Sequence, residues 1–563
     1  MLVLCVVFSL LSAVVPFARA FYRIEISCNE GWDVYNAAVV AAHGQLYPAR
    51  TGWTTVNYPM VWLALVAQFH RWTHEYLFTA RALSLLALLS SCVLVSAIVR
   101  SLGAARRPAL LAGVFCLALF CVAADFPCFV GIDDPTIPAL AIYLAGLWVF
   151  LRWGVSRLGL AFSALLFVLA FSTKHNPVEF PLAVFAGLLL VSLRRALWFA
   201  ACGLTSLAAA IALHFVYGGP YFLRDLLAPR SYSVAKVPLM LGVVWGPLLL
   251  PLGVSLYTAY LYRRDPRRRV VAFVLLFGLL MGGYFLGGYG VSINVLFGCF
   301  VAMCILLGLF FDRVFSRSQR WVVYAPLALF AWLLIPWLVV PPLDDRAAVQ
   351  LNWNPPLALE QTAAAEARFE DGVAMLRSQP GPALCESLLR CYFAGKPYIY
   401  DPYNATRMIG LGQLDSEVIV SAIRRRQFGA IQLSGPIDDN RRTELFAPPI
   451  LAAIRENYHS AFEDQDGAIY LPNPVSAAPA GMTAIASAQN VALRTNGTPA
   501  LNAPSLSLKL LAVRMPDRIT PGGISRRGVE SGDAHKSKFV GGETGRGGQH
   551  AQAVAHAAPE VDR

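Results

Sequence analysis

The sequence predicts a polytopic α-helical membrane protein with a small extracytoplasmic α/β domain and a disordered tail. Of its 563 residues, 57% are hydrophobic and 14% are charged, and the mean hydropathy is +0.54. A soluble domain usually carries about a quarter charged residues. The apolar residues also gather in stretches of about 17–25 residues, which are long enough to cross a bilayer as helices. Together these observations exclude a soluble protein.

Eleven apolar stretches are predicted to span the membrane, and together they form a membrane body over residues 1–341. Three of them are short, which leaves a count of ten or twelve open. The predicted spans are roughly 2–20, 77–99, 108–125, 136–152, 158–173, 177–193, 196–217, 238–262, 270–289, 293–311 and 321–341.

Positive charge alternates between the loops that join these spans. Fifteen basic residues lie in five short loops, most densely over 263–269, whereas seven lie in the longer intervening loops. Cytoplasmic loops carry the excess of Lys and Arg in membrane proteins. The pattern predicts a cytoplasmic N-terminus and places everything after Pro342 on the outer side of the membrane. It also accounts for the net charge of +12 without a nucleic-acid partner.

The first apolar stretch has two interpretations. It ends in Ala18-Arg19-Ala20, which resembles the small-residue cleavage site of a signal peptide. However, no Lys or Arg precedes it, and the run is long for a signal peptide. We favour a retained first helix, because that helix places the next loop on the same side as the other arginine-poor loops.

Soluble character returns over residues 345–473, which are predicted to form the extracytoplasmic α/β domain. Residues 474–563 are rich in Ala, Gly, Ser and Pro, with few aromatics, and are predicted to be disordered. In the α/β domain, helices are expected at 357–376, 416–427 and 449–458, and strands at 383–387, 397–400, 429–433 and 467–471.

Most of the eleven cysteines give little information. Seven lie within predicted spans, where a thiol acts as a small apolar side chain. Cys385 and Cys391 lie in the predicted extracytoplasmic domain, where an oxidising compartment allows a disulfide. The sequence does not decide between a disulfide and two free thiols, because it does not reveal the distance between the two residues.

The first external loop, about residues 21–76, has the strongest signs of function. Glu25, Glu30 and Asp33 lie near its start, and it is rich in aromatic residues such as Tyr58. Long ordered loops tend to carry function. A carboxylate could act there as a general base on a hydroxyl, while an aromatic ring stacks on a sugar. The alternative is a solvated loop with an interfacial aromatic belt.

Two adjacent acids, Asp133 and Asp134, lie in the second external loop directly before Pro135. Adjacent carboxylates beside hydrocarbon are costly unless they pair, bind a cation or face water. Asp134 is expected to cap the next helix, since Pro is favoured in the first turn. Asp133 is therefore the better candidate for a catalytic or metal-binding role.

A third external segment, residues 172–177, contains Lys174 and His175, which could hold a phosphate at the membrane surface. The alternative for Lys174 is a lysine that snorkels to the interface. Arg224 and Arg230, in the loop after the predicted span 196–217, are further candidates for phosphate binding.

The order of these pieces resembles the GT-C class of membrane glycosyltransferases. Within that class they are similar to the bacterial family 39 branch, which includes lipid A aminoarabinose transferases and is related to protein O-mannosyltransferases. The resemblance covers about residues 21–195. The segments that carry it are NEGWDVYNAAVVAAHGQLYP, NYPMVWLALVA, GIDDPTIPALAIYLAGLWVF and FSTKHNPVEFPLAVFAGLLL.

This resemblance implies sugar transfer, with inversion, from a polyprenyl phosphate to a lipid, glycan or protein acceptor in the cell envelope. An acid of the first external loop would deprotonate the acceptor hydroxyl, and cations would hold the departing phosphate. The family commonly opens its motif with an Asp-Glu pair, whereas this chain has Asn29 at the first position. Glu30 or Asp33 must then serve as the base, or the activity is altered or lost.

Cofactors and other function classes stay open at this point. Some proteins of this class use a divalent ion, so Mg²⁺ or Mn²⁺ bound by Asp133 is a hypothesis. A membrane transporter or flippase is a second function class, but transporters tend to carry polar residues near the bilayer midplane. Here the acids and cations gather at the outer ends of nearly uncharged helices. An inactive GT-C homologue that acts as a membrane partner is the third hypothesis.

Overall fold

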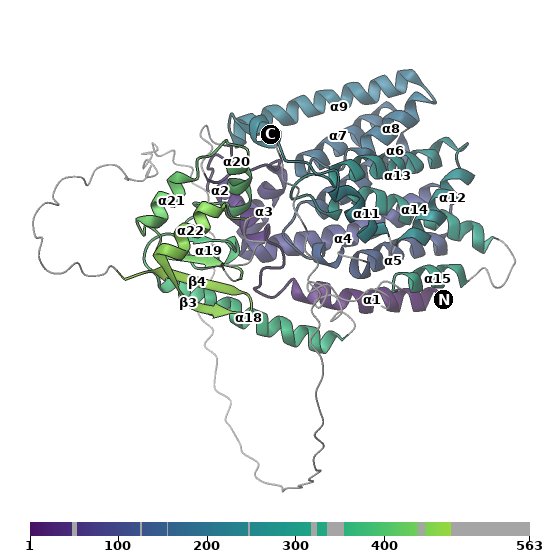
Figure 1. The fold of residues 1–563 in the computed structure, drawn as a ribbon. Helices are drawn as coiled ribbons and strands as arrows, with labels where there is room; N and C mark the ends of the chain where they lie inside the picture. Colours follow the sequence, from purple (N-terminus) through teal and green to yellow (C-terminus); the bar gives the residue numbers. More distant parts are fainter. Residues whose placement is uncertain are drawn as a thin grey trace, which may run out of the picture. The chain divides into compact units, whose positions relative to one another are not determined.

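The computed structural model describes residues 1–47, 53–123, 126–154, 156–245, 248–316, 324–334, 354–435, 437 and 445–474. The predicted tail, residues 474–563, therefore falls outside the described residues from position 475 onward. Residues up to 334 form a helical body (Figure 1). Its helices are α1 (Leu2–Arg19), α2 (Glu30–Ala41), α3 (Val61–Thr73), α4 (Tyr76–Ser101), α5 (Arg106–Val122), η1 (Phe126–Phe129), α6 (Thr136–Trp153), α7 (Arg157–Thr173), α8 (Glu179–Leu189), α9 (Leu193–Leu213), η2 (His214–Gly218), α10 (Phe222–Leu226), α11 (Lys236–Trp245), α12 (Leu249–Leu261), α13 (Pro266–Phe285), η3 (Ile293–Leu296), α14 (Phe297–Phe315) and α15 (Ala325–Trp332).

The helices of the body make this an integral membrane protein. Six of the described helical segments are long and apolar enough to cross a bilayer, and α7, α8 and α12 are shorter apolar helices. The predicted span 238–262 is divided into α11 and α12, and the last predicted span, 321–341, is described only as far as residue 334. The count of eleven crossings stays a prediction. The six segments are Leu2–Arg19, Tyr76–Ser101, Thr136–Trp153, Leu193–Gly218, Pro266–Phe285 and Ile293–Phe315.

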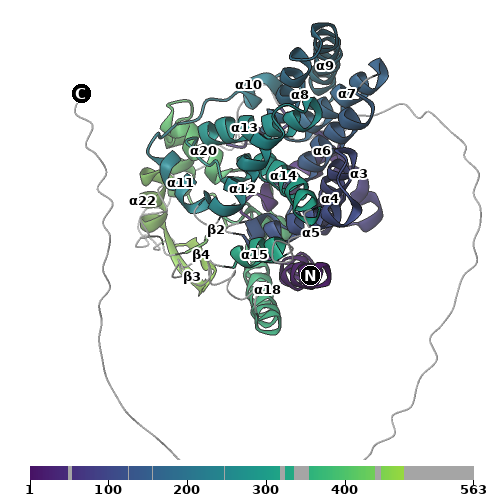
Figure 2. The ribbon, with the colours of Figure 1, turned by 90° about the vertical axis from the view of Figure 1, so that its right-hand side faces the viewer.

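Helix α14 lies at the centre of the body. Its apolar window, within Ile293–Phe315, is 89% buried, whereas that of the segment Leu193–Gly218 is only 11% buried. A helix that is hydrophobic on all sides is buried in a protein core or faces lipid. Helix α14 contacts α4, α5, α12 and α13, which surround it (Figure 2), so it is a helix buried in the protein core. Segment Leu193–Gly218 has the exposure expected of a lipid-facing helix.

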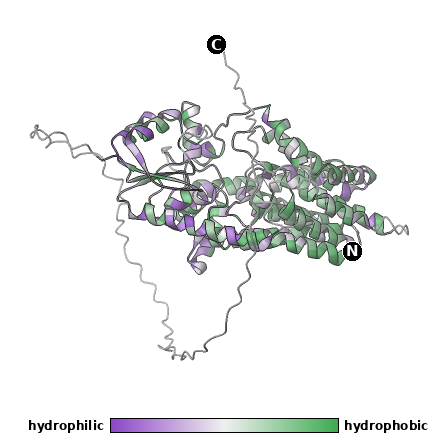
Figure 3. Cartoon of the chain, turned by 60° about the horizontal axis from the view of Figure 1, so that its bottom comes forward, coloured by the Kyte–Doolittle hydropathy of each residue, from purple (hydrophilic) through white to green (hydrophobic). Residues whose placement is uncertain are grey.

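Residues after 354 form a mixed structure around a four-stranded sheet. The strand order is β1-β2-β4-β3, with β1 parallel to β2 and the other two pairs antiparallel. Figure 3 shows more hydrophilic surface on these elements than on the long helices of the body. The elements are α18 (Pro355–Ser378), β1 (Ala383–Cys385), α19 (Leu388–Phe393), α20 (Pro402–Gly410), α21 (Glu417–Arg424), β2 (Ala430–Leu433), α22 (Pro448–Asn457), β3 (Tyr458–Asp464) and β4 (Gly467–Pro472).

One strand prediction in this region is wrong, and one strand was missed. Residues 397–400 are not a strand; instead Tyr398 stacks on Tyr35 of α2, and Tyr400 stacks on Phe446. Strand β3 was not predicted, because it lies at the edge of the sheet and most of its residues are exposed. An exposed edge strand needs no apolar run, so its sequence gives no hydropathy signal. The structure also joins Cys385 to Cys391 in a disulfide that links β1 to α19.

Helix α2 packs closely against α19. A Cβ atom on Gly31 would lie 2.1 Å from the backbone N of Leu389, so only glycine fits at this contact. The two helices share a hydrophobic cluster that we call the junction cluster. It contains Trp32, Val34, Tyr35, Phe369, Val373, Leu388 and Leu389. The site described below begins on the first turns of α2, so this packing fixes its position.

Replacing Gly31 with alanine is expected to destabilise the protein by about 1–3 kcal/mol, because the new methyl group overlaps backbone atoms that cannot rotate away. Thermal unfolding of the purified protein measures this loss. Gly203→Ala in α9 is the control, because its Cβ would meet no atom within 4 Å. Equal melting temperatures for the two variants would contradict the prediction.

Candidate active site

Five charged side chains from three segments meet beside the start of α2. Glu30 and Asp33 come from α2, Asp133 and Asp134 from the turn before α6, and Lys174 from the end of α7. All five are buried. Acids in the first turn of a helix are favoured by its dipole, which helps to explain why two of them begin α2. The three external segments that the sequence singled out therefore converge.

The carboxylate of Glu30 is fixed by several hydrogen bonds. Its two carboxylate oxygens each accept a hydrogen bond of 2.7 Å from the guanidinium of Arg81, and both residues are fully buried. The same carboxylate accepts bonds from the backbone N–H groups of Ile26, Ser27 and Asp133. A carboxylate that accepts this many hydrogen bonds is fixed in place. Its geometry is that of a structural ion pair.

Asp33 differs from Glu30 in its hydrogen bonding. Its side chain is fully buried, yet neither carboxylate oxygen has a hydrogen-bond partner in the described part of the chain. Burial, followed by the negative charges of Asp133 and Asp134, raises the pKa of Asp33 well above its ordinary value. The charge of Lys174 opposes that rise. Asp33 is therefore a proton acceptor with raised proton affinity and free lone pairs.

Asp133 and Asp134 have different contacts in the site. Asp133 accepts a 2.8 Å bond from the indole N–H of Trp62 at one oxygen, and its other oxygen has no described partner. Burial is the largest cause that raises the pKa of Asp133. Asp134 accepts a bond from the N–H of Thr136, the first residue of α6. The N-cap position of α6 is Pro135, so the predicted N-cap role of Asp134 is wrong, because the helix begins one residue later than expected.

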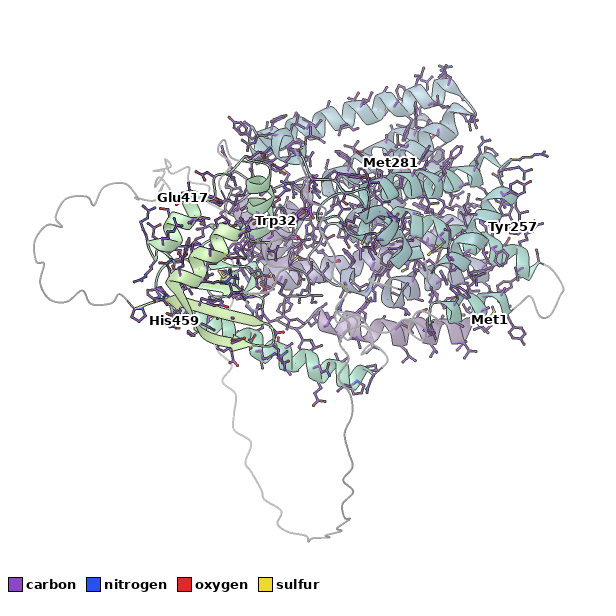
Figure 4. The ribbon with its side chains drawn as sticks, viewed as in Figure 1. Met1, Trp32, Tyr257, Met281, Glu417 and His459 are labelled. Carbon is purple, nitrogen blue, oxygen red and sulfur yellow. A yellow bond between two sulfur atoms is a disulfide. The ribbon has the colours of Figure 1, made fainter. Side chains whose placement is uncertain are left out.

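Lys174 is 2% exposed and lies between an acid and a ring. Its Nζ is 3.8 Å from Oδ2 of Asp134 and 3.4 Å from the ring centroid of Tyr58. Tyr58 in turn packs edge-to-face against Trp32, the labelled residue of α2 in Figure 4. Burial alone would lower the pKa of Lys174, but Asp134 and Tyr58 outweigh it and raise the pKa. The lysine is a buried cation.

The other predicted phosphate ligands lie at different places. Burial, and then Lys174 and Arg230, lower the pKa of His175 to about 3, so its imidazole is neutral at physiological pH. The charge of Arg230 therefore acts on His175. Arg224 forms a 2.7 Å ion pair with Asp225 and lies over the ring of Tyr221. Arg230 is thus the better placed of the two arginines.

Several contributors to this site were not predicted. Arg81 fixes Glu30, Trp62 fixes Asp133, and the charge of Asp33 acts on Tyr398 from the C-terminal region. For Arg81 a signal existed, because an arginine inside an apolar span needs a partner. For Trp62 and Tyr398, nothing in the sequence distinguishes them from other aromatic residues at the membrane surface.

A metal ion does not fit this site well. Within the described ranges, no three His, Cys, Asp or Glu side chains are grouped so that they could hold one. One oxygen of Asp133 is bonded to Trp62, and Lys174 already places a positive charge beside Asp134. No step below therefore depends on Mg²⁺ or Mn²⁺.

A hollow of about 380 Å³ lies at the other end of α2. Its lining includes Val40, Met60, Gln68, Arg71 and Tyr217, and none of the candidate site residues. Asp33 and Val40 are seven residues apart on α2, or about 10 Å along a helix. The hollow is therefore a neighbour of the site and not part of it.

Two solved structures of one protein share this architecture. ArnT from Cupriavidus metallidurans in the apo state aligns over 83% of this chain and 97% of its own, with 14% identity and a TM-score of 0.55. The structure of the same protein bound to undecaprenyl phosphate gives a TM-score of 0.52 over the same shares, also at 14% identity. ArnT is an aminoarabinose transferase of the GT-C class. This chain has the GT-C fold.

The GT-C fold predicted from four external motifs is thus confirmed. Those motifs lie within residues 21–195, whereas the alignment with ArnT extends over 83% of the chain, so the likeness reaches well beyond them. No family model matches the chain, and no curated protein matches it. The low identity to ArnT shows the fold alone, so the chemistry of this protein is argued from its own residues.

Proposed function

We propose that this protein is a glycosyltransferase that moves a sugar, with inversion, from a polyprenyl phosphate to the hydroxyl group of an extracytoplasmic acceptor. The observation that carries the proposal is Asp33, a buried carboxylate with free lone pairs beside Asp133 and the cation of Lys174. An acid next to a cation suits a reaction that removes a proton and releases a phosphate. The undecaprenyl phosphate in ArnT supports the donor class.

In this mechanism Asp33 takes the proton of the acceptor hydroxyl. The hydroxyl oxygen forms a bond to the anomeric carbon, while the bond between that carbon and the phosphate oxygen breaks. The phosphate leaves with the bonding electrons and remains on the lipid. Lys174 and Arg230 neutralise its charge, and His175 can donate a hydrogen bond as a neutral imidazole. The proton ends on Asp33, whose raised pKa suits it for that role.

Asn29 does not by itself indicate an inactive protein. Asn29 precedes Asp33 by four residues, and the N–H of Asp33 donates to the carbonyl of Asn29, so both lie on one face of α2. A carboxylate one turn later can reach the same region. We therefore assign the base to Asp33 and a structural role to Glu30, whose carboxylate is bound to Arg81.

The compartment is part of the same proposal. The disulfide between Cys385 and Cys391 supports an oxidising environment for the region after residue 354. Together with the arginine-rich loops, which we expect in the cytoplasm, it supports a periplasmic location of the α/β region at a bacterial inner membrane. The acceptor would then be a lipid, glycan or protein of the cell envelope.

Lys174→Gln is expected to raise the KM for the lipid donor by about 10- to 100-fold, because it removes a charge-assisted contact to the phosphate. Initial rates against donor concentration in lipid nanodiscs measure this. Arg152→Gln is the control, since Arg152 is an exposed cation at the end of α6. An unchanged KM for Lys174→Gln would contradict the assignment of Lys174.

The rate should rise with pH through the ionisation of Asp33, since only its ionised form accepts a proton. Because burial and Asp133 raise the pKa of Asp33, this rise should lie above the usual range of an aspartate. Asp133→Asn removes one of the raising charges, so the residual activity should show a rise at lower pH. Profiles of kcat/KM against pH test both expectations, and an unmoved profile in Asp133→Asn would contradict the coupling.

The proposal as a whole is tested with protein in lipid, a panel of radiolabelled polyprenyl phosphate sugars, and membrane extract as acceptor. Transfer of label by the wild type, and its loss in Asp33→Asn at normal protein levels, would support the enzyme. If no donor is consumed and the variant changes nothing, the inactive-homologue and transporter hypotheses take precedence. Uptake of labelled lipid-linked sugar into sealed vesicles would then distinguish those two.

A further inference from the structure

Helix α20 joins the C-terminal region to two loops of the helical body. Just before it, the N–H of Asp401 donates to the carbonyl of Trp53 over 2.8 Å. On the helix itself, the hydroxyl of Tyr403 donates to the carbonyl of Tyr289 over 3.0 Å, and the rings of these two tyrosines stack at 5.3 Å. These contacts fix the orientation of α20 against the first external loop and against the turn between α13 and η3.

Arg407 lies one helical turn after Tyr403 and therefore on the same face of α20. The residue is 6% exposed, and its Nε and Nη1 have no hydrogen-bond partner among the described residues. Buried charges are costly unless they are paired. Arg81 shows the usual solution, because its guanidinium is bonded to Glu30 and to backbone carbonyls. Arg407 lacks comparable partners at those two nitrogens.

Among neighbouring charges, the one with the largest effect on the pKa of Arg407 is another cation. After burial, the charge of Arg230 is the next largest cause that lowers the pKa of the Arg407 guanidinium, ahead of the opposing effects of Tyr403 and Asp401. Arg230 also acts on His175, which follows Lys174 in the chain. Arg407 is buried and Arg230 is partly buried, and two neighbouring guanidinium groups would be stabilised by an anion between them.

We propose that Arg407 and Arg230 together bind the phosphate of the lipid donor, so that the C-terminal region completes the phosphate site. The identity of this phosphate rests on the proposed function. A guanidinium can bind phosphate through two parallel hydrogen bonds, either from Nε with Nη2 or from Nη1 with Nη2, so each pair would use one of the two nitrogens of Arg407 that have no described partner. The proposal explains why Nε and Nη1 of a buried arginine have no hydrogen-bond partner in the described part of the chain.

Binding of undecaprenyl phosphate to the full-length protein in nanodiscs tests this directly, with undecaprenol and inorganic phosphate as comparison probes. Arg407→Met keeps the length of the side chain and removes the charge. We expect it to weaken binding of undecaprenyl phosphate about tenfold or more. Binding of undecaprenol should not change. Weakening confined to inorganic phosphate would overturn the assignment to a lipid phosphate.

Thermal unfolding separates binding from packing. Because Arg407→Met removes an uncompensated buried charge, the melting temperature of the lipid-free protein should stay the same or rise. Arg424→Met is the matched control, since Arg424 forms an exposed pair with Glu417 on α21 of the same region. The control should leave lipid binding unchanged.

A second variant covers the case in which Arg407→Met is unstable. Arg407→Lys keeps a charge but loses the planar fork, so its affinity for undecaprenyl phosphate should fall between those of the wild type and Arg407→Met. Equal losses in both variants together with lower melting temperatures would indicate packing and overturn the proposal. If Arg230→Gln and Lys174→Gln weaken binding while Arg407→Met does not, only this inference fails. If the wild type binds undecaprenyl phosphate no better than undecaprenol, the proposed function fails with it.

Discussion

Asp33→Asn is expected to reduce sugar transfer by about 10²- to 10⁴-fold, the usual contribution of a general base. The amide keeps the shape of the side chain but cannot accept the proton of the hydroxyl. The protein itself should gain stability near neutral pH, because the wild-type carboxylate is buried without partners. Since the pKa of Asp33 is raised on folding, the wild type loses stability as the pH rises through that pKa, and the variant does not.

Transfer assays and thermal unfolding at several pH values measure both effects. Asp371→Asn is the matched control, because Asp371 is an exposed acid on α18. It should change neither activity nor stability. An active Asp33→Asn variant would remove Asp33 as the base, whereas an inactive but unstable variant would indicate a structural role.

Glu30→Gln should mainly reduce stability, whereas Asp33→Asn should mainly reduce activity. Arg81 would keep its charge inside the protein without the carboxylate that now holds it at two distances of 2.7 Å. Breaking a buried ion pair from one side costs about 3–5 kcal/mol, so we expect a large fall in melting temperature and in membrane levels. Activity per folded molecule should fall less than in Asp33→Asn.

The double variant Glu30→Gln/Arg81→Met decides whether this loss comes from the unpaired arginine. Removing both charges should restore part of the stability that Glu30→Gln loses. If the single variant is as stable as the wild type, Arg81 finds other partners and the structural role of Glu30 is wrong. If it is stable and wholly inactive, Glu30 would replace Asp33 as the candidate base.

The sequence could indicate which loops form the site but not which acid is free. External loops of one membrane protein open on the same side, so the segments of Asp33, Asp133 and Lys174 could be expected near one another. Glu30 and Asp33 look alike in the sequence, three residues apart. What separates them is Arg81, which lies 51 residues after Glu30 inside an apolar helix. Long-range pairing of this kind has no local signature.

In the C-terminal region, too, the sequence does not reveal long-range contacts. Hydropathy indicated most of the helices and strands with apolar faces, but it missed β3, whose side chains are largely exposed. Arg407 is one of many arginines on amphipathic helices. That its Nε and Nη1 have no hydrogen-bond partner among the described residues becomes visible only when α20 is placed against Tyr289 and Trp53. Neither Tyr289 nor Trp53 is near it in the sequence.

The junction cluster has a consequence for work with fragments. Its side chains come from α2 on one side and from α18 and α19 on the other, with Gly31 in close contact with Leu389. A fragment that begins near residue 345 would carry Leu388, Leu389 and Phe369 without their covering partners. Exposed apolar patches of this kind promote aggregation. The region after residue 345 should therefore be insoluble when expressed alone, and exchanging it with that of another protein of the same fold should require exchanging α2 as well.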